Sequence, residues 1–241
     1  MTTLFISDLH LNAGNPAIGE QFLDFLNGEA QDAAALYILG DLFESWVGDD
    51  DPDPYYASIK QALRRFTDGG VATFAMHGNR DFMLGARFAA ETGISLLPDP
   101  VIHTIAGSPV ILSHGDALCT DDVAYQALRT MTRDPAWQAM MLEKTLQERL
   151  DFAAEARRQS RAYAMQVSED IADVNQAAVE ALMRELQTFT LLHGHTHRPA
   201  VHEFQVDGQA ARRIVLGDWY EQGSVVRWDE SGPVLSALPR A

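Results

Sequence analysis

Three histidines stand within five residues near the end of the chain, at His193, His195 and His197. They follow an apolar run over residues 189–192, and Gly194 separates the first two. Side chains at positions i, i+2 and i+4 lie on one face of an extended backbone, so we expect these imidazoles to converge. Histidine is the side chain that most often binds metal ions, and glycine lets the backbone approach closely. The stretch therefore predicts part of a metal site that other segments complete, with a polar loop as the alternative.

Four earlier segments offer further side chains of metal-ligand type. In each, an apolar run ends in a short turn that carries Asp, His or Asn. These residues are Asp8 with His10, Asp41, Asn79 and His114. Loops at the carboxyl ends of strands lie on one side of a layered α/β fold. We therefore expect the five turns to form one site.

The candidate ligands predict a particular class of cation and reaction. Carboxylate, amide and imidazole groups without thiolate suit Mn²⁺, Mg²⁺, Fe²⁺ or Zn²⁺. Seven candidates, counting His195 and His197, exceed what one ion needs. Two ions about 3.5–4 Å apart, bridged by a carboxylate, would use them all, and a water held between them would attack a phosphoryl group.

The elements that must position these residues alternate between strands and helices. Apolar runs predict strands at 3–6, 34–39, 71–76, 109–112 and 189–192, and at 200–206, 212–216 and 224–228. Helical spacing predicts helices that end near Gly28 and Gly69, and others over 82–92 and 177–186. The four acids within Asp49 to Asp53 predict a solvated loop, or a second cation site. The pattern indicates an α/β fold of one domain over residues 1–241.

The segment over residues 121–165 departs from this alternation. It is helix-permissive, rich in Met and Trp, and electrically neutral, with seven bases and seven acids. Flexible Met-rich surfaces adapt to irregular apolar ligands. The segment predicts a lid or acyl-chain groove, or else a helical extension packed on the main domain.

Composition excludes several classes of partner. With 34 acids against 18 bases, the chain has a formal net charge of -16, which repels nucleic acid and anionic bilayers. Cys119 is the only cysteine, so no intrachain disulfide can form, and its expected role is a small buried hydrophobe. No secretory signal and no membrane-spanning run is recognisable. The cysteine content leaves the compartment open and is compatible with the cytosol, and any membrane contact would have to be peripheral. No obligate protein partner is indicated.

The five turns resemble the five motif blocks of the calcineurin-like metallophosphoesterases. The blocks are Asp8-x-His10, Gly40-Asp41, Gly78-Asn79-Arg80-Asp81, His114-Gly115-Asp116 and Gly194-His195-x-His197. The resemblance implies a two-sheet β-sandwich flanked by helices. It also implies a first metal site of Asp8, His10, Asp41 and His197, and a second of Asp41, Asn79, His114 and His195, with Asp41 bridging.

Nearly the whole chain is also similar to one branch of these enzymes, the UDP-2,3-diacylglucosamine hydrolases of lipid A biosynthesis. The similarity includes residues 5–11, 37–44, 48–51, 77–82, 118–122, 173–176 and 193–199. It implies hydrolysis of the pyrophosphate of UDP-2,3-diacylglucosamine to UMP and 2,3-diacylglucosamine 1-phosphate (lipid X), by attack of metal-activated water at the α phosphorus. It further implies Mn²⁺ as the cation, peripheral attachment to the cytoplasmic side of the inner membrane, and an acyl-binding helical lid at about 121–167.

Arg80 favours a phosphoanhydride substrate on physical grounds. In many relatives a histidine follows the Asn and is proposed to protonate an alkoxide leaving group, whereas arginine, with a pKa above about 12, is a poor proton donor. A phosphate leaving group, with a second pKa of about 6, needs charge stabilisation more than a proton. Arg80 can supply it through bidentate contacts. Pairing of Arg80 with Asp81 on the surface is the alternative.

The resemblance also implies contacts to the substrate. Asn79, Arg80 and His195, predicted as catalytic, match family substrate contacts, as do Asp122 and Ser160. Two positions depart from the best-known members, because Ala164 and Val167 replace Asn and Lys. Arg157, Arg158 or Arg161 could compensate for the lost lysine, and Arg157 is the expected one.

Two other functions remain open from the sequence. One is a soluble dinucleoside polyphosphate hydrolase or general phosphodiesterase on the same fold. The other is a non-catalytic scaffold, which retention of all seven ligand types disfavours.

Overall fold

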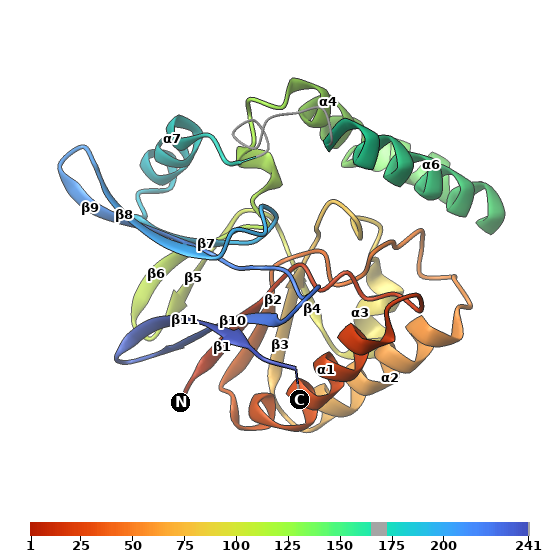
Figure 1. Cartoon of the computed structure of the whole chain (residues 1–241), viewed down its shortest axis with the longest axis horizontal. Coiled ribbons are helices and arrows are strands. Elements are labelled where there is room, and N and C mark those ends of the chain that lie inside the picture. The colour runs from red at the N-terminus through yellow and green to blue at the C-terminus, as the bar shows by residue number, and fades with distance from the viewer. Residues whose placement is uncertain (165–172, 241) are drawn as a thin grey trace.

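The computed structural model of the chain describes residues 1–164 and 173–240, except for the side chains of Arg161 and Ala164 (Figure 1). Within these ranges, two β-sheets pack face to face and helices cover both outer faces. The predicted α/β sandwich flanked by helices is confirmed. None of the described helices is both long and apolar enough to span a bilayer.

The first sheet carries the N-terminal strands. Its order is β11-β10-β1-β2-β3-β4. The parallel strands are β1 (Thr3–Ile6), β2 (Ala35–Ile38), β3 (Ala72–Met76) and β4 (Ser95–Leu97), and the antiparallel pair is β10 (Gly223–Asp229) with β11 (Gly232–Leu238). Because β1, β2 and β3 are parallel, their carboxyl ends meet at one edge.

The second sheet has the order β5-β6-β7-β9-β8. Its strands are β5 (Val101–Ile105), β6 (Ser108–Leu112), β7 (Thr190–His193), β8 (Ala200–Val206) and β9 (Gln209–Val215). The central strands β6, β7 and β9 run parallel to one another. The turns after β6 and β7 therefore also leave from one edge.

The apolar runs form strands because both of their faces are buried. Leu4 and Ile6 of β1 pack under α1 (Pro16–Asn27), α2 (Pro54–Asp68) and α3 (Ala86–Thr92), whereas Phe5 points into the core between the sheets. On the outer face of the second sheet, Val179 of α7 (Gln176–Leu186) packs in a core with Leu191. Strands buried on both faces read as continuous hydrophobic runs rather than alternating ones, which is why they are recognisable in the sequence.

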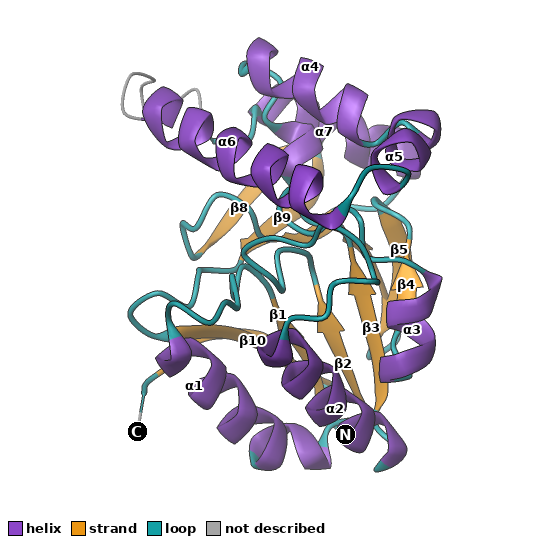
Figure 2. Ribbon diagram, turned by 90° about the vertical axis from the view of Figure 1, so that its right-hand side faces the viewer, coloured by secondary structure: helices purple, strands orange, loops and turns teal. Residues whose placement is uncertain are grey.

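Three helices form a separate layer above the strand ends (Figure 2). They are α4 (Val123–Thr132), α5 (Pro135–Leu142) and α6 (Leu146–Ala164). Arg149 of α6 fixes this layer to the core, since its guanidinium contacts both carboxylate oxygens of Asp50 and the carbonyl of Val47. The helices cover the edge at which the candidate ligands lie.

Several sequence predictions of local structure need correction. Strands β4, β5 and β11 were not predicted, because β4 has three residues and β5 and β11 are only partly buried. The helix expected over 82–92 begins only at Ala86, because Leu84 closes a turn onto the Asp81 carbonyl.

The acidic loop also differs from its prediction. Asp49 accepts the backbone N–H groups of Gly85 and Phe88 at the start of α3, and Asp53 caps α2 through the N–H of Tyr55. Carboxylates at helix N-termini are stabilising. Within the described ranges no cluster suited to a metal ion lies in this loop, so these acids have structural roles.

Candidate dimetal site

The turns after β1, β2, β3, β6 and β7 bring all seven predicted ligands together. Five of the ligands have positive φ angles, between 51° and 68°; these are Asp8, His10, Asp41, His195 and His197. Such angles are uncommon outside glycine and concentrate at functional sites, where the surrounding structure holds them. The backbone is therefore shaped to aim these side chains.

This geometry corrects the expectation for the histidine stretch. Strand β7 ends at His193, and the left-handed conformations of His195 and His197 follow it. The two side chains diverge because the backbone turns, so they do not share one face of an extended strand. His193 faces the interior, where its Nδ1 lies 2.8 Å from the Gly194 carbonyl and its Nε2 contacts Arg213.

The first cluster joins Asp8, His10 and His197. Nε2 of His197 lies 3.2 Å from Nε2 of His10 and 3.4 Å from Oδ1 of Asp8. Two atoms that each lie about 2.1 Å from one ion are roughly 3.0–3.4 Å apart. These ligand atoms are already spaced as coordination of one cation requires.

The second cluster is centred on the Asn79 amide oxygen. Oδ1 of Asn79 lies 3.1 Å from Nε2 of His114 and 2.9 Å from Nδ1 of His195. One atom connects the two clusters, because Oδ2 of Asp41 lies 3.8 Å from Nε2 of His10 and 3.9 Å from Nε2 of His114. Asp41 thus occupies the position of a bridging ligand.

Buried polar atoms indicate that these residues fit metal ions. Oδ1 of Asp8 is buried and has no hydrogen-bond partner among the described residues, a costly state that a bound cation would relieve. Burial lowers the pKa of His195 to about 4, which keeps its ring neutral as a ligand. Burial alone would lower the pKa of His197, but the nearby carboxylates of Asp218 and Asp8 raise it to about 10. An ion that binds His197 must therefore displace a proton.

Two glycines are required by the close packing of the site. A Cβ on Gly78 would lie 2.0 Å from Oδ1 of Asp41, and one on Gly194 would lie 2.3 Å from Oδ2 of Asp8. Any larger residue would displace a candidate ligand, which explains the glycine in each motif.

Comparison with known proteins agrees with this geometry. Residues 1–199 match the family model described as calcineurin-like phosphoesterase. A UDP-2,3-diacylglucosamine hydrolase of Stenotrophomonas maltophilia is 50% identical over 247 residues, with 100% of each chain covered. A protein of the same name from Chromohalobacter salexigens is 50% identical over 97% of this chain and 95% of the other. The chain belongs to the UDP-2,3-diacylglucosamine hydrolases, within the calcineurin-like phosphoesterases.

A solved structure shows the shared fold. A novel archaeal phosphodiesterase has a TM-score of 0.51 and 13% sequence identity, and the alignment covers 99% of this chain and 100% of that one. At this identity the likeness concerns the phosphoesterase fold alone.

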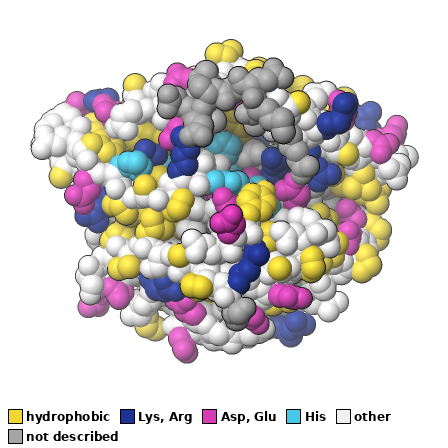
Figure 3. Space-filling model, viewed as in Figure 1, with side chains coloured by type: hydrophobic (Ala, Val, Ile, Leu, Met, Phe, Trp, Pro, Cys, Tyr) yellow, Lys and Arg dark blue, Asp and Glu magenta, His cyan; other side chains and the backbone are white. Residues whose placement is uncertain are grey.

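In this family member, a groove of about 830 Å³ opens between the helical layer and the ligand clusters. Histidine side chains, in cyan, are visible near the middle of the face shown in Figure 3. The groove is lined by His195, Asn79 and Arg80 on the core side and by Asp122 and Ser160 on the helical side. The structure thus brings together five of the predicted substrate contacts.

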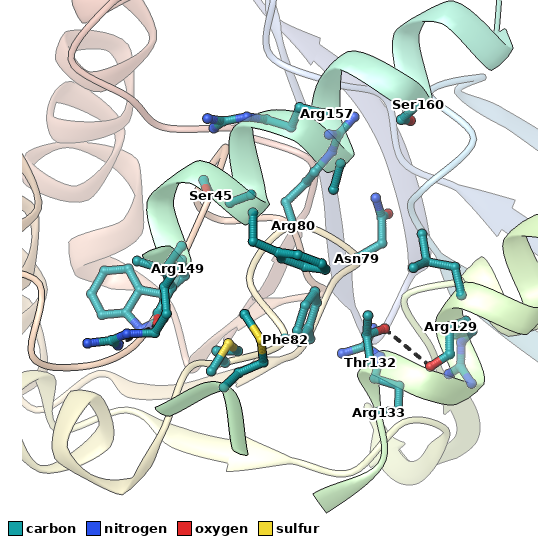
Figure 4. A pocket seen from close by; sticks show the side chains of 18 of the residues that line it. Ser45, Asn79, Arg80, Phe82, Arg129, Thr132, Arg133, Arg149, Arg157 and Ser160 are labelled. Atoms are coloured by element: carbon teal, nitrogen blue, oxygen red, sulfur yellow. Dashed lines mark hydrogen bonds between the residues drawn. The ribbon is translucent and has the colours of Figure 1, made fainter. Parts of the chain in front are cut away.

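A deeper cavity of about 110 Å³ adjoins Arg80 (Figure 4). Arg80 from the loop after β3 and Arg157 from α6 both line it. Aromatic and apolar side chains form much of the remaining wall, including Trp46, Phe82, Met83, Leu128, Trp137, Met141 and Phe152. A wall that combines arginines with apolar groups suits an amphiphilic phosphate.

The structure does not test two of the predicted substrate contacts, those of Ala164 and Val167. Ala164 is the last residue of α6, and its side chain is not described, whereas Val167 lies outside the described residues. Arg157 faces the cavity, as expected of the residue that compensates for the missing lysine, and it stays a prediction in that role.

Some residues near the site were not recognised from the sequence. Glu44 and Asp218 lie beside ligand histidines, and Asp218 follows Leu216-Gly217 at the end of β9. That arrangement repeats the strand, Gly and Asp pattern of Gly40-Asp41 and could have identified Asp218.

Asp116 contacts helix α4 rather than the ring of His114. It does not orient His114, whose Nδ1 lies 2.9 Å from the Leu39 carbonyl. Instead Oδ2 of Asp116 accepts a hydrogen bond from Tyr125 at 2.7 Å and lies 3.0 Å from Nε of Arg129. Asp116 therefore attaches helix α4 to the motif that carries His114.

Replacing Tyr125 by Phe should weaken this attachment. Hydrogen bonds to charged groups contribute about 1.5 kcal/mol or more, so Tyr125→Phe should lower the melting temperature by roughly 3–6 °C. Calorimetry of the metal-free protein measures the change. Tyr163→Phe is the matched control, because Tyr163 is 39% exposed and its hydroxyl also donates to a carboxylate, that of Asp122. Equal shifts in the two variants would contradict a special role for Asp116.

Proposed function

We propose that the chain hydrolyses the pyrophosphate bond of UDP-2,3-diacylglucosamine, yielding UMP and 2,3-diacylglucosamine 1-phosphate. The observation that carries this proposal is that two ligand clusters open onto one groove, to which the helices contribute apolar side chains such as Leu128, Met131 and Phe152. The substrate likewise combines polar and apolar parts, since its pyrophosphate joins a polar nucleotide to a diacylated sugar. The names and full-length similarity of the relatives support it.

The helical layer of α4, α5 and α6 serves in this proposal as the lid that the resemblance implies at about 121–167, and it covers the acyl chains. Burial of each methylene contributes about 0.8 kcal/mol, and the cavity wall offers aromatic rings such as Phe82, Trp137 and Phe152. Large apolar side chains are also exposed on the outside of the same helices, among them Val123, Met140 and Leu142. These groups support peripheral contact with the membrane that holds the lipid substrate.

Two divalent ions are assigned to the two clusters. The first is held by Asp8, His10, Asp41 and His197, and the second by Asp41, Asn79, His114 and His195. We propose Mn²⁺, the cation that the resemblance implies among those that carboxylate, amide and imidazole ligands suit. When bound, such a pair of ions activates water and neutralises charge on the phosphoryl group.

The side chains of the protein position and stabilise the reacting phosphates. Arg80 from the core and Arg157 from the lid line the cavity, where the departing sugar phosphate gains negative charge. Asn79 and His195 hold the phosphoryl group beside the ligand clusters. Asp122 and Ser160, which line the groove, contact the sugar, and Ala164 and Val167 stay predicted contacts from the resemblance alone.

The deciding experiment compares an acylated with a non-acylated substrate. With Mn²⁺, kcat/KM for UMP release from UDP-2,3-diacylglucosamine in detergent micelles should exceed that for UDP-glucosamine by at least about 100-fold, since four buried methylenes contribute roughly 3 kcal/mol. The same assay with Mg²⁺ and Zn²⁺ ranks the cations. Equal turnover of a soluble dinucleoside polyphosphate would instead favour the general phosphodiesterase, and absence of any hydrolysis would favour the scaffold.

A further inference from the structure

The rings of His10 and His197 each present one nitrogen to the first ligand cluster and the other nitrogen to a carboxylate. Nδ1 of His197 lies 3.3 Å from Oδ2 of Asp218. Nδ1 of His10 lies 3.3 Å from Oε2 of Glu44. Neither carboxylate belongs to the five motif blocks, and neither is among the seven candidate metal ligands.

We infer that Asp218 and Glu44 are positioning residues for the cation held by Asp8, His10 and His197. Each carboxylate would accept the Nδ1 proton of its histidine, which fixes the ring orientation and leaves Nε2 free to bind the ion. Such partners also increase the electron density of the ligand nitrogen. The inference rests on the metal assignment made under the proposed function.

Asp218 is itself held in place for this role. Its Oδ1 accepts the backbone N–H of Tyr220 at 2.9 Å, which leaves Oδ2 directed at His197. The ring of Tyr220 stacks on the ring of His10, with centroids 5.5 Å apart and planes inclined by only 4°. The loop over residues 218–220 therefore restrains both histidines of the first cluster.

Glu44 comes from the loop after β2, whereas Asp218 comes from the loop after β9. Glu44 lies three residues after Asp41, and its side chain is 14% exposed. Nδ1 of His10 is buried and has no aligned hydrogen-bond partner in the described ranges. Hydrogen bonds at active sites are often long before the ligand binds, so we expect this contact to shorten when a cation fixes the ring.

The second cluster is supported differently. Nδ1 of His114 points away from the cluster and lies 2.9 Å from the backbone carbonyl of Leu39, whereas His195 directs its Nδ1 at the cluster itself, toward the Asn79 amide. In the described ranges a carboxylate stands behind the ligand rings of the first cluster only. Neutralising Asp218 or Glu44 should therefore weaken one of the two ions selectively.

The test measures Mn²⁺ binding to the metal-free, full-length protein by electron paramagnetic resonance of free Mn²⁺. For Asp218→Asn and Glu44→Gln, one of the two dissociation constants should rise 10- to 100-fold, the usual effect of removing such a partner. The other constant should stay within about threefold of the wild type. Asp207→Asn is the control, because Asp207 is an exposed carboxylate that pairs with Arg184, and it should leave both constants unchanged.

The outcomes separate this inference from the metal assignment. Wild-type protein that fails to bind two Mn²⁺ ions would overturn the assignment itself. Wild-type protein that binds two, with both variants unchanged, would overturn only the positioning roles. Equal weakening of both ions, together with a lower melting temperature of the metal-free variants, would show a merely structural role and also overturn the inference.

Discussion

Asp41→Ala should reduce UMP release by at least about 1000-fold, or roughly 4 kcal/mol of transition-state stabilisation. The reason is geometric, since one oxygen of Asp41 lies within 3.9 Å of a ligand nitrogen in each cluster. Its other oxygen accepts the backbone N–H of Arg80 at 2.8 Å, so the substitution also releases the loop that carries Asn79 and Arg80. The measurements are steady-state UMP release and metal content after gel filtration.

Asp41→Asn separates the two effects of this change. An amide keeps the acceptor for Arg80 but removes the negative charge that two cations share. We expect the loop to remain in place and the metal content to fall. Retention of more than a few per cent of activity in Asp41→Ala, with normal melting temperature, would reject a two-metal mechanism.

Arg80→Ala should lower kcat by about 100-fold, or ~2.7 kcal/mol, without loss of bound metal. Removal of one preorganised charge-stabilising donor commonly has an effect of this size. The guanidinium lines both the groove and the adjoining cavity, and its Nε is buried without a hydrogen-bond partner among the described residues. It is therefore available to an anionic group in the cavity.

Two further variants test whether the loss of activity in Arg80→Ala is specific to the guanidinium group at this position. Arg80→Lys should be intermediate, because lysine keeps the charge but cannot make bidentate contacts. Arg158→Ala is the matched control, because Arg158 has a 77% exposed side chain on α6 and pairs with Glu155. An Arg80→Ala enzyme as fast as the wild type would remove the role proposed for this residue.

The candidate site was recognisable because each ligand follows a strand that is buried on both faces. A continuous apolar run such as Leu36–Leu39, followed by Gly40-Asp41, fixes the type of element and the place where it ends. Parallel neighbours then bring the strand ends together. The candidate ligands are predicted from this local pattern, whereas their assignment to two sites is what the family resemblance of the motifs implies.

Contacts between residues far apart in the chain could not be predicted from the sequence pattern. His10 and His197 are separated by 187 positions, yet their Nε2 atoms lie 3.2 Å apart. The left-handed backbone at His195, the attachment of Tyr125 to Asp116 and the approach of Asp218 to His197 depend on how loops leave different strands. No periodicity encodes such geometry, because it results from packing of the whole chain.

The sequence by itself thus predicted which side chains could bind cations and which strands carry them, because strand burial and ligand chemistry are local properties. Only the tertiary structure showed which oxygen of Asp41 lies between the clusters, which carboxylates stand behind the histidines and what the helical layer covers. Those features depend on distances of a few ångströms between residues far apart in the chain, which are set by three-dimensional packing.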